Sequence, residues 1–311
     1  MTRVTDLAYY PLKSAGGVPV PEAVVEHWSI RHDRRWMLLQ DDGRMISARE
    51  APTLLLLRAE HRTHDGALVV RHTAGAVDPL EVSVPDQGEH REGVVWGAAV
   101  RGREASPEAS AWFEDYLGRT GLHLVWCDDP TFRPVDQRYA EPGDTVTFSD
   151  GFPLLLTSTP SLGRLQEWVD ESTDRRGEPR VELTMDRFRP SVVVDGGEPL
   201  EEQGWDRVRI GEMTFRMAKH CGRCVMTTYD TTSLDRTKEP LRSLGEHNAI
   251  DGRLVFGVNL VPEGTGTLRV GDEVTPIQGS WVSSNLLGPN PHDVGGGEVL
   301  GGDCAPPARG R

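Results

Sequence analysis

The chain has 311 residues, a formal net charge of −14 and 37% hydrophobic residues. This length allows one large domain or two moderate ones, and the hydrophobic content is enough for a buried core. The acidic balance excludes nonspecific binding to nucleic acid or to anionic membranes as the main role. No run of 18 apolar residues occurs, and residues 1–20 lack the basic start and apolar centre of a signal peptide. We therefore expect a cytoplasmic protein that binds neither nucleic acid nor membrane.

Strand signals dominate the first hundred residues. Short segments rich in β-branched or large apolar residues, separated by Gly, Asp and Pro, predict strands at 54–58, 67–71, 81–84 and 94–99. The triplet Asp41-Asp42-Gly43 lies between two further apolar segments and predicts a hairpin turn. Residues 1–104 are therefore predicted to form a mostly β unit.

Two helices are predicted from capping residues and helical spacing. Ser106 suits an N-cap, Pro107 suits the first helical position, and Gly118 ends the apolar pattern. A second helix is expected to begin near Thr159-Pro160, and strand patterns return at 191–195, 207–210, 213–217, 254–259, 266–270 and 272–276. We predict a mostly β (α+β) fold with a few packing helices. Its parts are residues 1–104, residues 105–278 and a flexible Gly- and Pro-rich tail, 279–311.

The segment Cys221-Gly222-Arg223-Cys224 places two of the four cysteines and one cation on a short turn. A neighbouring guanidinium favours the thiolate form of a cysteine, which binds soft metals and attacks electrophiles. A structural zinc site is one alternative, but it needs two more ligands at suitable spacing. A thioredoxin-like dithiol is another, but it needs a βαβ frame.

Other polar segments are candidates for binding an anion. Thr157 and Ser158 follow a predicted buried strand at a helix start, where free N–H groups and the helix dipole attract negative charge. An ordinary N-cap is the alternative there. The segments 10–14, 33–36 and 187–191 each contain a Lys or Arg, and each alone would be an ordinary surface charge.

Taken in order, these segments resemble one family. The matching segments are Tyr10-Pro11-Leu12-Lys13-Ser14, Asp33-Arg34-Arg35-Trp36, Ser47-Ala48-Arg49, Asp150-Gly151-Phe152-Pro153-Leu154-Leu155, Ser161-Leu162, Phe188-Arg189-Pro190, Arg223 to Asp230, Lys238-Glu239-Pro240-Leu241 and Gly271-Asp272. The chain resembles the MOSC-domain molybdenum proteins that carry a MOSC N-terminal β-barrel domain, among them the amidoxime-reducing component group and its bacterial counterparts. The resemblance covers about residues 1–277 and implies a β-barrel MOSC domain after a β-rich N-terminal domain.

The resemblance implies a molybdenum cofactor (Mo-molybdopterin) whose metal is bound by one protein thiolate, and that position falls on Cys224. Cofactor contacts carried over by motif fall on Lys13, Arg34, Thr157, Ser158, Arg189, Ser191, Gly222 and Arg223. Cations and a helix N-terminus suit the cofactor's phosphate. Two positions depart from the family pattern, since Ser191 stands where relatives have Asn and Gly222 where Ser is usual.

The implied function is that of a molybdenum-dependent oxidoreductase that reduces N-hydroxylated or N-oxide small molecules. Cys224 is the expected metal ligand and catalytic centre, and Asp230 is a candidate proton donor, with a structural capping role as its alternative. A sulfur or cofactor carrier with a persulfide on Cys224 is the alternative function. Pyridoxal phosphate binding is not expected.

The electrons are expected to come from another protein. Cys304 is the only cysteine after Cys224, and one cysteine is too few to bind an iron–sulfur cluster in that part of the chain. No Gly-x-Gly-x-x-Gly motif follows a predicted strand, so no dinucleotide site is signalled. A separate ferredoxin, flavoprotein or similar donor is therefore the expected partner.

Overall fold

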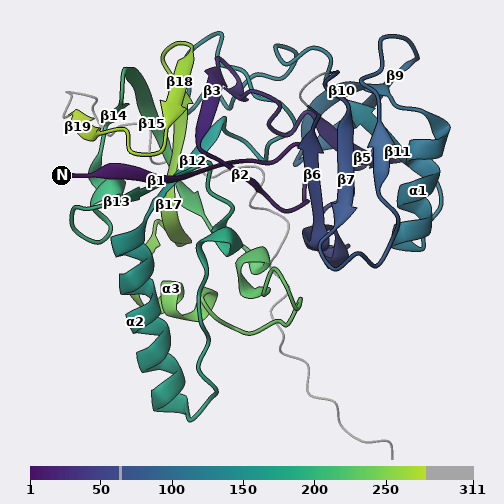
Figure 1. Ribbon diagram of the computed structural model, residues 1–311. Helices are drawn as coiled ribbons and strands as arrows, with labels where there is room; N and C mark the ends of the chain where they lie inside the picture. The colour runs from purple at the N-terminus through teal and green to yellow at the C-terminus, as the bar shows by residue number, and fades with distance from the viewer. Residues whose placement is uncertain (63–64, 278–311) are drawn as a thin grey trace, which may run out of the picture.

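The computed structural model describes residues 1–62 and 65–277, and their strands form four sheets (Figure 1). The predicted tail, residues 279–311, lies outside the described residues. A mostly β fold is confirmed. In the described residues no sheet closes on itself into a barrel.

The largest sheet has nine strands and forms the core of what we call the C-terminal lobe. Its order is β19 (Val274–Ile277), β14 (Arg207–Ile210), β15 (Met213–Gly222), β17 (Arg253–Pro262), β12 (Leu154–Ser158), β13 (Val192–Asp195), β1 (Arg3–Tyr9) and β2 (Val18–Val20), with β16 (Ala249–Ile250) paired to β17. A small sheet of β18 (Gly266–Arg269), β3 (Glu22–Glu26) and β4 (Ser29–Ile30) belongs to the same lobe. Buried Val, Leu and Ile side chains of both sheets share one core, typical of packed sheet faces.

Residues 36–126 form the N-terminal lobe, on the right of Figure 1. One of its sheets is β5 (Trp36–Gln40), β11 (Leu122–Trp126), β10 (Ala98–Glu104) and β9 (His90–Val95), and the other is β6 (Leu57–His61), β7 (Leu68–His72) and β8 (Leu80–Val82). Helix α1 (Pro107–Leu117) packs against β11 and β8. The pairing thus differs from the linear division predicted at residue 104, because β1–β4 return to the C-terminal lobe while α1 and β11 stay with the N-terminal lobe.

Two sequence-predicted strands have different structures. The first half of 54–58 belongs to a 3-10 helix, η1 (Pro52–Leu56), and only its end enters β6. The segment 94–99 is not one strand, because Trp96 and Gly97 both have positive φ and form the tight turn between β9 and β10. Two consecutive left-handed residues are what such a hairpin needs.

The helices begin and end where the capping residues predict. Ser106 caps α1 through a hydrogen bond from the Ala109 N–H, and Gly118 ends the helix in the left-handed conformation. Helix α2 (Thr159–Arg176) is capped by Ser158 and ends at Gly177, also left-handed. It packs with the short α3 (Leu241–His247) on one side of the large sheet. Shorter 3-10 turns are η2 (Met185–Phe188), η3 (Glu201–Gly204) and η4 (Val225–Thr228).

Irregularities in the β15–β17 pair shape the middle of the sheet. The register shifts between Met217 and Lys219 and again between His220 and Gly222. Such bulges turn side chains to a new face of the strand. In β17, Gly257 has φ +76, and a Cβ placed there would lie 2.6 Å from the carbonyl oxygen of Leu156. Glycine is therefore required at this point of close strand approach.

We expect Gly257→Ala to lower the free energy of unfolding by about 2 kcal/mol or more, because it combines left-handed strain with a backbone clash. Gly245→Ala in α3 is the matched control, since its nearest neighbour is 3.6 Å away and alanine favours a helix by up to about 1 kcal/mol. Urea unfolding of both variants measures the difference. Equal stability of the two variants would contradict this reading of β17.

Candidate functional site

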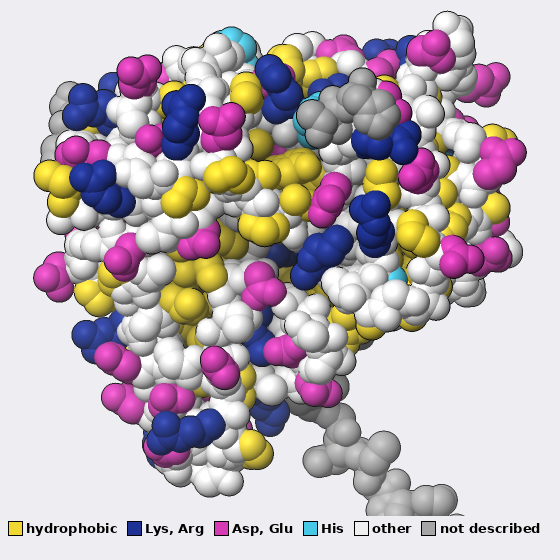
Figure 2. Space-filling view, viewed as in Figure 1, with side chains coloured by type: hydrophobic (Ala, Val, Ile, Leu, Met, Phe, Trp, Pro, Cys, Tyr) yellow, Lys and Arg dark blue, Asp and Glu magenta, His cyan; other side chains and the backbone are white. Residues whose placement is uncertain are grey.

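A cavity of about 550 Å³ lies between the two lobes. Acidic side chains are scattered over the face in Figure 2, in keeping with the net charge of −14, but the cavity walls are mostly basic. Two aspartates line it, Asp136 and Asp150, against ten basic residues: Lys13, Arg34, Arg49, Arg133, Arg138, Arg187, Arg189, Lys219, Arg223 and Arg253. A concave site of this size and charge suits an anionic small molecule.

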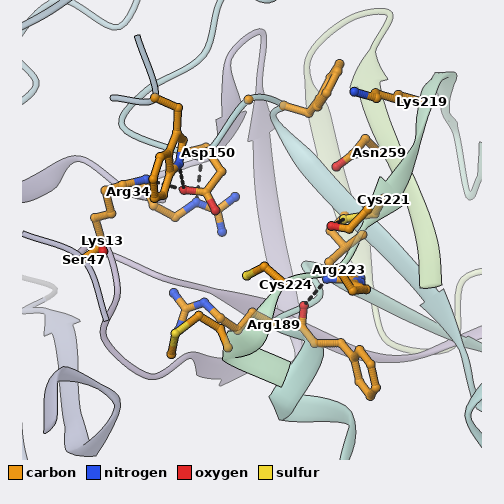
Figure 3. Close-up of a pocket in the computed structure, with 18 of the residues that line it drawn as sticks. Lys13, Arg34, Ser47, Asp150, Arg189, Lys219, Cys221, Arg223, Cys224 and Asn259 are labelled. Carbon is orange, nitrogen blue, oxygen red and sulfur yellow. Dashed lines mark hydrogen bonds and ion pairs between the residues drawn. The ribbon is translucent and has the colours of Figure 1, made fainter. Parts of the chain in front are cut away.

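Three of the sequence-predicted cations meet on one side of the cavity (Figure 3). Lys13 follows β1, Arg34 precedes β5, and Arg189 ends η2. Arg34 and Arg189 have φ values of 44° and 56°, in the left-handed region that non-glycine residues seldom adopt. Ser14 and Trp96, which also line the cavity, have positive φ as well. Backbone strain concentrated in one cavity is typical of functional sites.

A buried tyrosine and a buried aspartate hold Arg34 and Arg189 together. The guanidinium carbon of Arg189 lies 4.5 Å from the Tyr10 ring centroid, and that of Arg34 lies 5.3 Å from it. Arg34 Nε lies 2.7 Å from Asp33 Oδ2, while the Tyr10 N–H donates to Asp33 Oδ1 at 2.8 Å. Burial raises the pKa of Tyr10 to about 12 despite both guanidinium charges, so its hydroxyl stays protonated and donates to the Pro190 carbonyl.

Lys13 is buried and its charge is partly neutralised. Its Nζ lies 2.6 Å from Asp150 Oδ1 and donates to the Phe148 carbonyl at 2.7 Å. Trp96, at the β9–β10 turn, donates its indole N–H to the same Asp150 oxygen. Burial lowers the pKa of Lys13 to about 8, although Asp150 opposes this shift. A bound anion would restore the proton, because opposite charge favours the ammonium form.

The two thiols of the Cys-x-x-Cys segment have different surroundings. Cys221 lies near the end of β15, where burial raises the pKa of its thiol. Cys224 lies beyond the strand, directly before η4, and in Figure 3 its sulfur points into the centre of the cavity. Between them, Arg223 donates to the carbonyls of Phe256 and Phe188, at 2.6–2.8 Å and 3.1 Å. Arg223 therefore anchors the turn, and only one of the thiols stands at the centre of the cavity.

Three predicted cofactor contacts do not reach the cavity lining. Thr157 is fully buried, and its hydroxyl donates to Met185 Sδ. Ser191 is also buried, and its Oγ is 3.4 Å from the Leu155 N–H. Ser158 caps α2. Their contact with a cofactor stays a prediction that this geometry does not support.

The N-terminus of α2, which was predicted to attract an anion, is occupied by a carboxylate of the chain itself. The buried carboxylate of Glu202, in η3, accepts hydrogen bonds from Ser158 Oγ at 3.1 Å and Ser161 Oγ at 2.8 Å. Burial raises the pKa of Glu202. The start of α2 thus has the ordinary capping role that the sequence left open, reinforced by an internal carboxylate.

Asp230 also lies outside the cavity lining. It accepts backbone N–H groups of Thr232 and Ser233, each at 2.9 Å, and pairs with Arg187 at 2.9 Å. These backbone hydrogen bonds, with help from Arg187, lower the pKa of Asp230. An ionised carboxylate has no proton to give, so the geometry favours the capping alternative for Asp230.

Two family models match this chain. The MOSC N-terminal beta barrel domain matches residues 1–120, and the MOSC domain matches residues 143–275. The chain belongs to the MOSC domain family. It is 31% identical to mitochondrial amidoxime-reducing component 1 of Homo sapiens, over 87% of this chain and 82% of that protein. It is 32% identical to mitochondrial amidoxime reducing component 2 of Rattus norvegicus, with the same coverage.

Several residues of the cavity carried no sequence signal. Arg133, from the loop before β12, is buried and donates to the carbonyls of Thr147, Ser149 and Asp150. Lys219 and Asn259 come from the middle of strands, where an isolated polar residue has no motif. Alternation along β15 could have pointed to Lys219 only if the bulge before it were known.

Neither a membrane span nor a protein-only metal site occurs in the described part of this MOSC chain. None of its described helices is long and apolar enough to cross a membrane. Among residues 1–62 and 65–277, no group of three or more His, Cys, Asp or Glu side chains could hold a metal ion. A metal bound by Cys224 would therefore need ligands from beyond these side chains.

We expect the affinity of inorganic phosphate for the chain, stripped of bound small molecules, to fall as pH rises above about 8. Free Lys13 loses its proton there, so binding must take a proton up, and the affinity should fall by up to about tenfold per pH unit. Calorimetric titrations between about pH 7 and 9.5 measure this. Lys13→Met should flatten the profile, whereas Lys238→Met, which removes an exposed cation outside the cavity, should not. A pH-independent affinity in the unmodified chain would refute the assignment.

Proposed function

We propose that this MOSC protein is a molybdenum-cofactor-dependent reductase of N-hydroxylated or N-oxide small molecules, with Cys224 as the protein ligand of the metal. The observation that carries the proposal is one thiol at the centre of a cation-lined cavity between two lobes. The relatives named amidoxime-reducing component support this reaction class. The range of substrates and the electron donor that we propose are not stated in the names of these relatives.

The residues present fit the cofactor's chemistry. A thiolate is a soft ligand suited to molybdenum held by a dithiolene. Lys13, Arg34 and Arg189 would hold the phosphate by charge-assisted hydrogen bonds.

The protein's own contribution is to hold the Cys224 thiolate in position and to keep water away from it. When bound, the cofactor supplies the two-electron chemistry that removes oxygen from an N–O bond. The Arg223 clamp fixes the backbone that carries Cys224, so the thiolate is held in place before a ligand arrives. Trp96 and Asp150 bring the N-terminal lobe against Lys13 and close one side of the cavity. Both lobes are therefore needed for a complete site.

We further propose that a separate redox protein delivers the electrons. The expected donor is a ferredoxin, flavoprotein or similar carrier, because the sequence shows no dinucleotide motif and too few cysteines for a cluster. Such encounters are often small and transient, and a basic patch on the donor would speed docking to a chain of net charge −14. The cytoplasmic location stays a prediction, since the named relatives are mitochondrial.

We expect Cys224→Ser to abolish reduction of N-hydroxylated substrates and to lose molybdenum while the chain stays folded, because a hard hydroxyl replaces a soft thiolate. Cys221→Ala is the matched control and should keep its metal, since the Cys221 thiol lies on the strand side of the Arg223 clamp. Metal analysis, circular dichroism and an amidoxime-reduction assay measure the three properties. Equal loss of metal in both variants would favour a two-thiolate site. Purified chain without molybdenum but with a persulfide on Cys224 would favour the sulfur-carrier alternative.

We expect the purified chain to reduce an N-hydroxylated substrate with reduced viologen or an added carrier system, but not with NADH alone. The physical reason is that no part of the sequence signals a site where hydride could be accepted from a nicotinamide. Anaerobic assays with each reductant test this. Steady NADH-driven turnover by the isolated chain would overturn the need for a donor protein.

A further inference from the structure

One exposed arginine of the cavity lining has no role in the cofactor assignment. Arg49 follows the buried residues 45–48, ends the segment Ser47-Ala48-Arg49, and lines the cavity. Its guanidinium carbon lies 4.0 Å from the centroid of the Trp96 ring. Within residues 1–62 and 65–277, the guanidinium group makes no hydrogen bond or ion pair. Its N–H groups are therefore available to a ligand.

The backbone at Arg49 is fixed by a short turn. The carbonyl of Ser47 accepts hydrogen bonds from the N–H groups of Glu50 and Ala51, at 3.1 and 3.0 Å. The N–H of Ser47 in turn donates to Glu50 Oε1 at 3.3 Å. An arginine that starts from a fixed backbone loses less conformational freedom when it binds a ligand than one on a mobile loop.

The aromatic ring under Arg49 is also held in place. Trp96 lies in the β9–β10 turn, and its indole N–H donates at 2.9 Å to Asp150 Oδ1, which lies 2.6 Å from Lys13 Nζ. These contacts join Lys13 to Arg49 through two intermediate side chains. Stacking on an aromatic face restrains a guanidinium group without using its N–H donors.

Two carboxylates that could neutralise Arg49 have other partners. Glu50, the next residue, lies 3.4 Å from Arg44 Nη1 and 3.7 Å from Arg119 Nη1. Asp150 interacts electrostatically with Arg49, but its Oδ1 is bound by Lys13 and Trp96. A restrained guanidinium group with unused donors suits a planar carboxylate, because two parallel N–H···O bonds can form.

We propose that Arg49, positioned by the Trp96 ring, is a specificity-determining residue that binds a carboxylate of the substrate, so that N-hydroxylated compounds carrying an acid group are preferred. The reaction in this statement rests on the proposed function. The carboxylate subsite itself rests on the unused guanidinium donors, the fixed turn and the aromatic support.

The kinetic test uses the ratio of kcat/KM for 3- or 4-carboxybenzamidoxime to that for the corresponding methyl compound. Both isomers are needed, because the ring position sets how far the acid lies from the N–O group. We expect a ratio of about ten or more for at least one isomer, the usual worth of a charge-assisted hydrogen bond. Arg49→Met should lower this ratio to about one. Lys238→Met, which removes an exposed cation outside the cavity, should leave it unchanged.

Two further sets of variants test the geometry. Arg49→Lys keeps the charge but cannot form two parallel hydrogen bonds, so it should keep only part of the preference. Trp96→Leu should lower the ratio several-fold, and Trp96→Phe, which restores an aromatic face, should recover most of it. If Trp96→Leu lowers both kcat/KM values equally and leaves the ratio unchanged, the positioning role of Trp96 is wrong.

A binding arm needs no turnover. Calorimetry with 3- and 4-carboxybenzamide and their methyl counterparts should show tighter binding of one acid to the wild type, lost in Arg49→Met. If no amidoxime is reduced but this binding pattern holds, the proposed reaction fails and the subsite survives. No preference for either acid in both arms overturns the subsite. Loss of acid binding in Arg189→Ala but not in Arg49→Met also overturns it, since the acid would then occupy the phosphate side.

Discussion

Repulsion between like charges is the constraint on which this structure depends. Ten Lys and Arg side chains around one cavity would drive the lobes apart in a medium of low dielectric constant unless each cation had a local partner. The fold supplies three kinds of partner. Buried Asp33 and the cavity carboxylate Asp150 neutralise Arg34 and Lys13. Backbone carbonyls accept from Arg133 and Arg223. The Tyr10 ring lies against both Arg34 and Arg189.

These partners come from distant parts of the chain, and this explains the shape of the molecule. Lys13 reaches the loop before β12 through Phe148 and Asp150, and Arg189 reaches the carbonyl of Ala15. The same interactions that offset charge repulsion therefore join the N-terminal segment, the connecting loop and the C-terminal lobe. Removing the cations would leave those carboxylates and carbonyls without partners, so the binding site and the junction of the lobes are one feature.

Much of the fold could be predicted from local signals. The caps of α1 and α2 and the strands from 207 onward follow from residue types at fixed spacing. The family resemblance, and not spacing, pointed to Lys13, Arg34, Arg189 and Cys224, which all line the cavity. Local sequence predicts a segment well when its residues strongly prefer one backbone conformation. The turn at Trp96 could not be predicted in this way, because a bulky residue rarely adopts positive φ.

The rest depends on contacts between distant residues. The sequence indicates that the helix beginning after Ser158 attracts a negative group at its N-terminus. Whether that group is a ligand or the carboxylate of Glu202, over forty positions away, depends on tertiary packing. The inward turn of Lys219 depends on a bulge, which one sequence does not reveal. Both proton transfer and capping were open for Asp230, and the backbone N–H groups two and three residues away favour the capping role.

The pairing of β1 with β13, and of β3 with β18, has a consequence for how the protein is made. The strands within residues 36–126 have all their sheet partners in that segment, so these sheets can form once the segment has left the ribosome. β1 and β3 can pair early only with their hairpin partners β2 and β4, because their other partners lie at 192–195 and 266–269. Contacts so distant in sequence form slowly. The second edge of β1, the strand that Lys13 follows, therefore stays open until β13 has been made, and the cavity, which Asn259 also lines, is completed later still.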